Sequence, residues 1–429
     1  MGVLPWRNRL ARSAVNRKVG VTSPFLSLQY NDCSLKKEAQ KFIPEIHATL
    51  LSMKGVRNGY PIVMPTNLEW SEVVEKIVVL CTNTPEGEFV TLSDSSLVIS
   101  NVHMYKLLTR EAEILEVLSG EPGTENHTTA GSLLWELPCS EFDGIWENLI
   151  FNDCIKDELL SYVDALVRLS EKNANSSVLR VNRLILLHGP PGTGKTSLCK
   201  ALAQKLSIRF SQKYCKVHFV EINSHGLFSK FFSESGKLIQ NMFGQIEELA
   251  EDQRAFVFVL IDEVESLTIA RGTLLNRNEP TDAIRAVNAV LTQVDHIRRR
   301  SNVFIFTTSN LIQSLDEAFT DRTDLSRLVS YPSPDAIYAI FCSCITELQR
   351  IGIVESASWT TEQCTDDQHK EKLMQLSRRS YGLSGRSLRQ LPVIAYSKLP
   401  VEQLSISQYL DVLEKALEEK LAEIAIRLP

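Results

Sequence analysis

An apolar run that leads into a glycine-rich loop constrains this chain more than any other stretch. Residues 184–187 read Leu-Ile-Leu-Leu, and after His188 the sequence continues Gly-Pro-Pro-Gly-Thr-Gly-Lys-Thr at 189–196. Apolar residues then recur at helical spacing through residues 197–206. A buried strand, a glycine loop and a helix, in this order, form the setting of a Walker A phosphate-binding loop. A glycine turn that opens an ordinary helix is the alternative, and the Lys-Thr end of the loop disfavours it.

Each residue type in this loop has a chemical reason. Glycine lets the backbone turn tightly and bring its N–H groups to phosphate oxygens, and the positive end of the next helix adds to the attraction. Lys195 can reach the β- and γ-phosphates, and the Thr196 hydroxyl can ligate Mg²⁺. The predicted nucleotide-binding residues of the loop are Gly189, Pro190, Pro191, Gly192, Thr193, Gly194, Lys195, Thr196 and Ser197.

Two further apolar stretches end in polar residues. Residues 257–261 are followed by Asp262 and Glu263, and residues 304–309 are followed by Asn310. Behind a Walker A loop, Asp262 is expected to hold Mg²⁺, and Glu263 to orient and deprotonate the attacking water. Asn310 can contact that water or the γ-phosphate. The alternatives are a pair of solvated acids at a strand end and a plain turn asparagine.

The order of apolar segments predicts the fold class, which is α/β. Strand-like and helix-like segments alternate after the loop, at residues 217–222, 238–249, 255–261, 283–294 and 303–308. Such alternation predicts a parallel sheet with helices on both faces, whose ligands bind beyond the carboxyl ends of the strands. From Pro332 the pattern becomes purely helical, which predicts a separate lid with helices near 335–350, 372–380, 387–397 and 407–428.

The domain organisation follows from these patterns and from the charges. No acid precedes Asp32, so residues 1–31 are expected to be a disordered basic tail, with an organelle transit peptide as the alternative. Residues 32–130 are predicted to form a small α/β domain, with helices at 36–53 and 105–118. A docking module and a purely structural cap remain equally open for it. Residues 131–332 are the predicted large ATPase domain, and residues 333–429 the lid.

Composition excludes several classes. The net charge of −6 over 429 residues disfavours general nucleic-acid binding. No apolar run is long enough to span a membrane. The nine cysteines contain no CxxC pair, which is typical of reduced thiols and not of a zinc site.

These motifs together resemble the AAA+ ATPases, and most closely the HORMA-remodelling ATPases of the pachytene checkpoint. The matching stretches are residues 187–206, Glu-Ile-Asn-Ser-His at 221–225, Ser-Glu-Ser-Gly-Lys at 233–237, residues 260–268 and 282–293, Asp321-Arg322, and Gly-Leu-Ser-Gly-Arg at 382–386. The resemblance runs from about residue 137 into the lid, and it is far more specific than a Walker motif alone.

The resemblance implies roles for further residues. Arg322 is similar to the arginine finger that reaches the γ-phosphate of a neighbouring subunit, which implies a homo-hexamer. A surface arginine paired with Asp321 or Asp324 is the alternative. Arg386 is similar to the lid arginine that senses the γ-phosphate. Phe231 and Phe232 occupy the position of the central pore loop, although both could be core residues, and Trp146 belongs either to an adenine-side linker or to the core.

The function that the resemblance implies is ATP-driven protein remodelling with Mg²⁺. Its substrates would be HORMA-domain proteins, converted from a closed to an open form with the help of a HORMA adaptor. Meiotic axis remodelling and spindle-checkpoint silencing would place the protein in the nucleus and cytoplasm. The rivals are a DNA-directed AAA+ machine, such as a clamp or helicase loader, and a scaffold that binds nucleotide without hydrolysing it.

Overall fold

The computed structural model divides the chain into two compact units, residues 1–106 and 107–429. It describes residues 25–30, 36–53, 55–62, 69–80, 89–90, 102–119, 127–172, 174–175, 178–179, 181–222, 235–265, 281–315, 317–355, 359–360, 363–364, 367–399 and 401–427. Each unit is built around its own sheet.

The N-terminal unit contains a three-stranded sheet. Strand β1 (Phe25–Tyr30) lies in the middle, antiparallel to β3 (Val74–Leu80) and parallel to β5 (Val102–Tyr105). Its remaining elements are α1 (Lys36–Lys41), α2 (Ile43–Ser52), the 3-10 helix η2 (Glu69–Glu72) and the short pair β2 (Val56–Arg57) and β4 (Phe89–Val90). Leu26, Leu28 and Trp70 are almost completely buried in its core.

Strand β1 corrects the expectation of a disordered tail through residue 31. Residues 25–30 form the central strand of this sheet, and Leu28 is fully buried. The basic residues that suggested a tail all precede Gly20, outside the described residues. The tail expectation is therefore wrong for residues 25–30, because the apolar side chains there outweigh the basic composition of the stretch before them.

The larger unit is organised on a seven-stranded sheet in the order β12-β8-β11-β10-β9-β7-β6. The five strands from β12 to β9 run parallel, and β7 and β6 add an antiparallel hairpin at one edge. The strands span Leu325–Leu328 (β12), Leu184–His188 (β8), Val303–Ser309 (β11), Ala255–Ile261 (β10), Lys216–Ile222 (β9), His127–Leu137 (β7) and Glu113–Ser119 (β6).

The edge hairpin corrects two expectations. Residues 113–119 form strand β6 and not a helix, and β7 pairs with β9 from Ser132 to Leu137. The hairpin therefore belongs to the large sheet, and a domain boundary at residue 130 would cut through β7. The apolar residues 114, 115, 117 and 118 fit either a helix or a strand, and pairing with the sheet decides between them.

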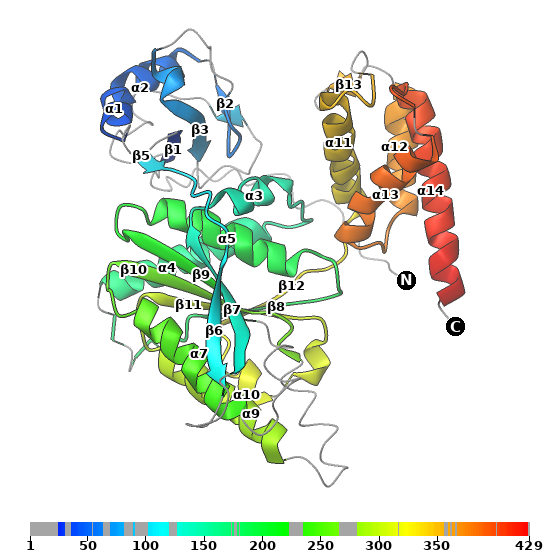
Figure 1. Cartoon of the computed structure of the whole chain (residues 1–429). Helices are drawn as coiled ribbons and strands as arrows, with labels where there is room; N and C mark the ends of the chain where they lie inside the picture. The colour runs from blue at the N-terminus through cyan, green and yellow to red at the C-terminus, as the bar shows by residue number, and fades with distance from the viewer. Residues whose placement is uncertain are drawn as a thin grey trace, which may run out of the picture. The chain divides into compact units, whose positions relative to one another are not determined.

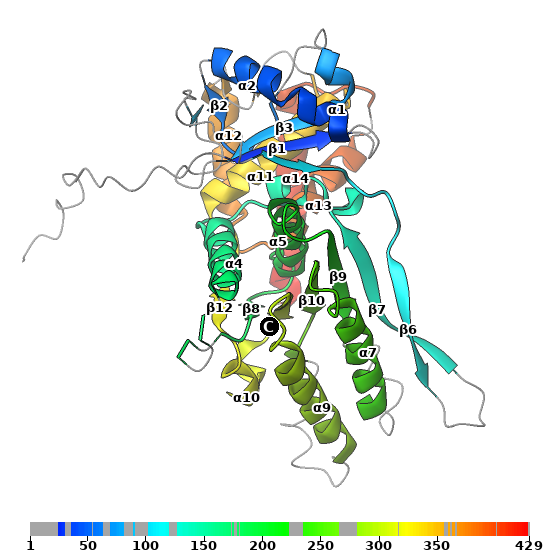
Figure 2. The ribbon, with the colours of Figure 1, turned by 90° about the vertical axis from the view of Figure 1, so that its left-hand side faces the viewer.

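Helices cover both faces of this sheet (Figures 1 and 2). Alternate strand residues point to opposite faces, so Ile185 and Leu187 join one core while Leu184 and Leu186 join the other. The first core packs on α3 (Ile145–Asn148), α4 (Ile155–Glu171) and α5 (Lys195–Arg209), and the second on α7 (Ser235–Leu249) and α9 (Thr281–Ile297). The predicted α/β sheet with helices on both faces is confirmed.

The lid is helical, as predicted. Its helices are α11 (Pro334–Arg350), α12 (Asp367–Arg379), α13 (Gly385–Lys398) and α14 (Ile406–Arg427), with the short pair β13 (Trp359–Thr360) and β14 (Gln363–Cys364). Ser333 caps α11, because its hydroxyl accepts a hydrogen bond from the Ala336 N–H, and Pro334 fits the first helical turn. The four helices enclose one core that includes Tyr409. No described helix has the length and apolarity that a membrane span requires.

Candidate functional site

The glycine loop between β8 and α5 adopts a conformation that only glycine tolerates. Gly189, Gly192 and Gly194 have φ values of +142°, +74° and +96°. The Gly189 N–H donates to the Ser309 carbonyl oxygen at 3.1 Å, and a Cβ at Gly189 would lie 2.3 Å from the Val329 oxygen. The loop therefore packs closely against the ends of the neighbouring strands. Because its glycines carry no Cβ, its backbone can also approach a ligand closely.

Lys195 lies at the start of α5 and is 6% exposed. Its ammonium group donates to the carbonyl oxygens of Gly189 and Pro190 and to Asn310 Oδ1, each at 2.8 Å. Burial lowers the pKa of Lys195, and the nearby carboxylates of Glu265, Asp262 and Glu263 oppose that shift. The structure thus brings together Lys195 and Asn310, two predicted site residues that lie 115 positions apart.

Thr196 and Asp262 form the second half of the site. The Thr196 hydroxyl donates to Asp262 Oδ1 and Oδ2 at 2.9 and 3.1 Å. A hydroxyl and a carboxylate that converge in this way are oxygen ligands of the kind that Mg²⁺ takes, so these residues fit the predicted metal position. The described residues contain no cluster of three or more His, Cys, Asp or Glu side chains that could hold a metal.

Thr308 lies near the end of β11, the strand between β8 and β10, and it stabilises the turn at Asp262. Its hydroxyl donates to Asp262 Oδ1 and accepts from the Glu263 N–H at 3.1 Å, and its carbonyl oxygen accepts from the Val264 N–H at 2.9 Å. Glu263 has a φ of +54°, which is rare for a residue with a side chain. The sequence reasoning missed Thr308, although a polar residue near the end of a buried strand was the available signal.

Glu265 is a further residue that the sequence reasoning missed. It is 7% exposed, and its Oε1 accepts the Asn310 N–H at 3.0 Å. The bond ties the turn after β10 to the end of β11. The signal was the third acid in the stretch Asp262-Glu263-Val264-Glu265.

A pocket lies between the loop and the lid. It is lined by Ile150, Phe151, Asn152, Asp153, Ile155, Thr193, Leu328, Val329, Ser330, Pro332, Ile340 and Gly385. Trp146, expected either in an adenine-side linker or in the core, does not line this pocket. Trp146 itself is 5% exposed and packs in the core between the sheet and helices α4 and α5. The Lys156 Nζ lies 5.1 Å from the centroid of its ring.

Arg386 lies in the first turn of α13, where the lid meets the loop. Its backbone N–H donates to the Gly192 carbonyl oxygen at 3.1 Å, and a Cβ at Gly192 would lie 2.9 Å from the Ser384 hydroxyl. The Arg386 side chain is exposed. The N-terminus of α13 is thus placed beside the candidate phosphate site, where its dipole favours an anion.

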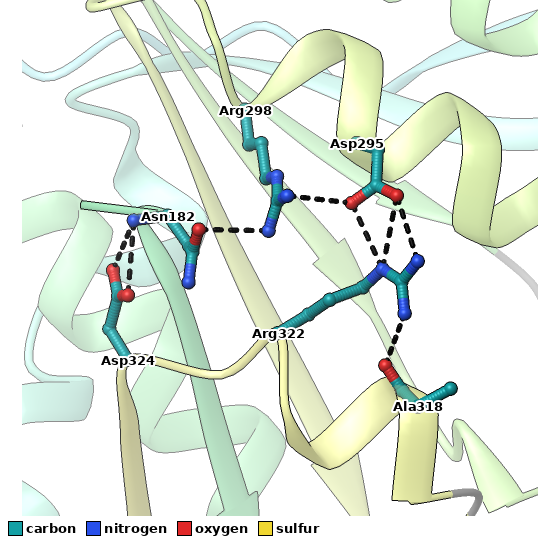
Figure 3. A network of polar contacts seen from close by, with 6 residues as sticks. All are labelled: Asn182, Asp295, Arg298, Ala318, Arg322 and Asp324. Carbon is teal, nitrogen blue, oxygen red and sulfur yellow. Dashed lines mark hydrogen bonds and ion pairs between the residues drawn. The ribbon is translucent and has the colours of Figure 1, made fainter. Parts of the chain in front are cut away.

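Arg322 lies apart from Lys195 and Asp262, at the turn between α10 (Glu317–Thr320) and β12. Its Nε and Nη2 donate to Asp295, and its Nη1 donates to the Ala318 carbonyl oxygen (Figure 3). The alternative reading named Asp321 or Asp324 as the partner of Arg322, and the structure adds Asp295, while the Asp324 carboxylate accepts backbone N–H bonds from Asn182 and Arg183. Phe231 and Phe232 lie outside the described residues.

Comparison with protein families covers most of the chain. Residues 185–331 match the ATPase family associated with various cellular activities (AAA). Residues 23–107 match the Pch2 N-terminal domain, and residues 333–421 match the TRIP13-like AAA+ ATPase lid C-terminal domain. The end of the N-terminal match agrees with the division of the structure at residue 106.

Individual relatives decide the family. The putative pachytene checkpoint protein 2 of Caenorhabditis elegans is 46% identical over 402 residues, which cover 90% of this chain and 94% of that protein. The chain belongs to the pachytene checkpoint protein 2 family. The Homo sapiens pachytene checkpoint protein 2 homolog is 40% identical over 395 residues, covering 87% of this chain and 89% of the human protein.

Solved structures agree with this family assignment. The structure of C. elegans PCH-2 has a TM-score of 0.79 at 44% identity, and the match covers 93% of this chain and 99% of that one. The structure of the E. coli MS115-1 HORMA:CdnC:Trip13 complex has a TM-score of 0.52 at 21% identity, over 66% of this chain and 94% of that one. The second likeness concerns the fold alone. The predicted resemblance to the pachytene-checkpoint AAA+ ATPases is confirmed.

Proposed function

We propose that this chain hydrolyses ATP and uses the energy to remodel HORMA-domain proteins. The observation that carries the first part is the convergence of Lys195, Thr196, Asp262 and Asn310 at the carboxyl ends of β8, β10 and β11, joined by hydrogen bonds of 2.8 to 3.1 Å. Ligands of open α/β sheets bind at this end. Membership of an AAA ATPase family agrees with nucleotide hydrolysis in general.

Each site residue has a proposed task. The loop backbone and Lys195 bind and orient the phosphates, and Glu263 accepts a proton from the attacking water. Asn310 orients that water or the γ-phosphate. Mg²⁺, held by Thr196 and Asp262, would neutralise charge on the phosphate oxygens. In this proposal, pocket residues 150–153 receive the base of the nucleotide, and Arg386 contacts the γ-phosphate from the lid.

We further propose a homo-hexamer in which Arg322 acts on the nucleotide of the adjacent subunit. Arg322 contacts Asp295 and Ala318, outside the cluster around its own Lys195. A positive charge placed away from its own site is suited to a site on a neighbouring chain, and a finger supplied in trans requires an assembled ring.

HORMA-domain proteins, presented by a HORMA adaptor, are the proposed substrates, and Phe231 and Phe232 the proposed grip on them. Support comes from the family, whose relatives are named for the pachytene checkpoint, and from the match of residues 23–107 to the Pch2 N-terminal domain. Among the distant solved structures, the E. coli MS115-1 complex pairs a Trip13 chain with HORMA and CdnC. Meiotic axis remodelling and checkpoint silencing, in nucleus and cytoplasm, are the proposed setting.

The test is a substrate trap. Glu263→Gln keeps the size and hydrogen-bonding capacity of the side chain but removes the base, so ATP and any engaged substrate should remain bound. We expect a HORMA-domain protein to co-purify with this variant in ATP, and the wild type to hydrolyse ATP at a rate that DNA does not change. Capture of DNA alone, with DNA-stimulated hydrolysis, would replace the proposal with a DNA-directed machine, and ATP binding without turnover would indicate a scaffold.

A further inference from the structure

Asp295, near the end of α9, holds the guanidinium group of Arg322 through two nitrogens at once (Figure 3). Arg322 Nε lies 2.9 and 3.1 Å from the two carboxylate oxygens, and Nη2 lies 2.9 Å from Oδ2. The two side chains are only 25% and 29% exposed. A two-point contact of this kind fixes the plane of the guanidinium and not merely its distance from the carboxylate.

The contact is part of a closed ring of polar groups. Asp295 Oδ1 also pairs with Arg298 Nη2 at 3.0 Å, and Arg298 Nη1 donates to Asn182 Oδ1 at 2.8 Å. The Asn182 N–H donates to the Asp324 carboxylate, with oxygens at 2.8 and 3.0 Å, and Asp324 follows Arg322 by two residues. Both the Arg322 side chain and the backbone that carries it are therefore fixed within one chain.

Asp295 does not fully neutralise Arg322, because it also pairs with Arg298. The cluster of Asp295, Arg298 and Arg322 holds one carboxylate and two guanidinium groups and so keeps a net positive charge, and Asp324, which accepts backbone N–H bonds, brings the ring as a whole to neutrality. A long side chain also loses conformational freedom when it meets a ligand, and a side chain that is already ordered loses less. A bidentate carboxylate thus orders Arg322 before the phosphate arrives without cancelling the positive charge of the cluster.

We propose that Asp295 is a positioning residue for Arg322, which it orients from within the same subunit for the nucleotide of the next one. The proposal rests on the proposed role of Arg322 in trans. Because Asp295 acts through Arg322, its loss should lower kcat and leave the KM for ATP nearly unchanged. We expect Asp295→Ala to lower kcat about ten- to a hundredfold, as misplacement of a catalytic group does.

Hexamers assembled from two different variants can show in which subunit Asp295 acts. Glu263→Gln subunits supply Arg322 but do not hydrolyse, whereas Arg322→Ala subunits have an intact site and supply no arginine. Mixing the two should restore hydrolysis where an Arg322→Ala site meets a Glu263→Gln neighbour. Asp295→Ala should reduce the restored rate when it is placed in the Glu263→Gln subunit, and leave it unchanged in the Arg322→Ala subunit.

Controls separate positioning from folding. Asp321→Asn makes a similar change of charge at the exposed residue next to Arg322, and in the Glu263→Gln subunit it should leave the restored rate unchanged. Asp295→Glu keeps a carboxylate and should recover part of the rate. If Asp295→Ala does not fold, Asp295→Asn removes the charge at nearly constant shape and is used in its place.

Three results would overturn the proposal. Equal loss with Asp295→Ala in either subunit would show a general structural role, and an unchanged or higher rate with the change in the Glu263→Gln subunit would show that Asp295 does not position Arg322. If mixing restores no hydrolysis although Glu263→Gln and wild-type subunits assemble into rings, the trans role of Arg322 itself is wrong, and the inference about Asp295 is wrong with it.

Discussion

The Thr196 hydroxyl and the Asp262 carboxylate lie within hydrogen-bond distance, at 2.9 and 3.1 Å, although 66 residues separate them. Thr196 follows β8 and Asp262 follows β10, and β11 runs between these two strands. Thr308 on β11 donates to the same carboxylate. The parallel order of the strands therefore brings three oxygen-bearing side chains together at the carboxyl ends of the strands. A divalent cation bound there would take the place of the hydrogen bond between Thr196 and Asp262, and the hydroxyl would keep its proton.

Removing the Thr196 hydroxyl should weaken the binding of the Mg²⁺ on which activity depends. We expect Thr196→Val to raise the Mg²⁺ concentration for half-maximal ATPase activity at least about tenfold, since loss of even an outer metal contact has that effect. Thr196→Ser keeps the hydroxyl and should stay close to the wild type. Magnesium titrations of the ATPase rate measure both, and equal curves for Val and Ser would contradict the metal role.

The glycine at position 189 should not tolerate a side chain. Its φ is +142°, and a Cβ there would lie 2.3 Å from the Val329 carbonyl oxygen. We expect Gly189→Ala to abolish binding of a fluorescent nucleotide, measured by titration. The matched control is Gly244→Ala in α7, where nothing lies within 4 Å, and which should stabilise the protein by about 0.5–1 kcal/mol. Tight nucleotide binding by Gly189→Ala would show that the loop can rearrange.

Strands β8, β10 and β11 of the parallel sheet were predictable because they are mainly apolar and end in, or are followed by, polar residues. Residues 255–261 are buried at every position, as a central strand with both faces covered must be. Strand β6 was not predictable in the same way. Its apolar residues suit a helix equally well, and only its partner β7, which joins β9, makes it a strand. Edge pairing of this kind is a tertiary property that no local pattern carries.

The aromatic pair Phe258 and Phe306 should account for a large share of the stability of the sheet. The two rings stack at 5.7 Å with an interplanar angle of 12°, and both residues are fully buried. We expect Phe258→Ala to lower the free energy of unfolding by about 3–5 kcal/mol. Phe258→Leu should cost clearly less, because it leaves a smaller cavity. Urea unfolding measures both, and equal losses would argue against a cavity as the cause.

The residues of the candidate site that belong to local sequence motifs were predictable. Contacts between residues that are distant in the sequence were not. Lys195, Thr196, Asp262 and Asn310 belong to local motifs, and the sheet brings them together. The partner of Arg322 is Asp295, 27 residues earlier on another helix, and nothing in the sequence around Arg322 indicates it. The alternative reading of Arg322 named Asp321 and Asp324, because local sequence offers only neighbours as partners.

Tyr162 should make stability fall at alkaline pH. Burial and the Asp324 carboxylate raise its pKa from its ordinary value near 10 to about 12. A neutral tyrosine is therefore favoured in the folded state, so its contribution is complete below pH 10 and is lost as the pH rises to about 12. Tyr162→Phe cannot ionise, and its unfolding free energy should fall less steeply over this interval. Parallel curves for variant and wild type would contradict the assignment.

Glu265 should affect hydrolysis through Asn310. Its buried Oε1 accepts the Asn310 N–H at 3.0 Å, and the Asn310 side chain in turn accepts from Lys195 Nζ at 2.8 Å. Glu265→Ala removes the acceptor, and we expect kcat to fall about tenfold or more, as misplacement of a catalytic group does. Glu265→Gln keeps an oxygen in place and should retain most of the activity.

A double variant distinguishes this positioning role of Glu265 from a contribution to folding alone. If Glu265 acts through Asn310, then Glu265→Ala should cause little further loss of kcat in an Asn310→Ala background, because the group that it positions is already absent. Thermal unfolding of each variant gives its stability separately from its rate. Fully additive losses, or a Gln variant as slow as the Ala variant, would mean that the charge or the packing of Glu265 matters, and not its bond to the backbone of Asn310.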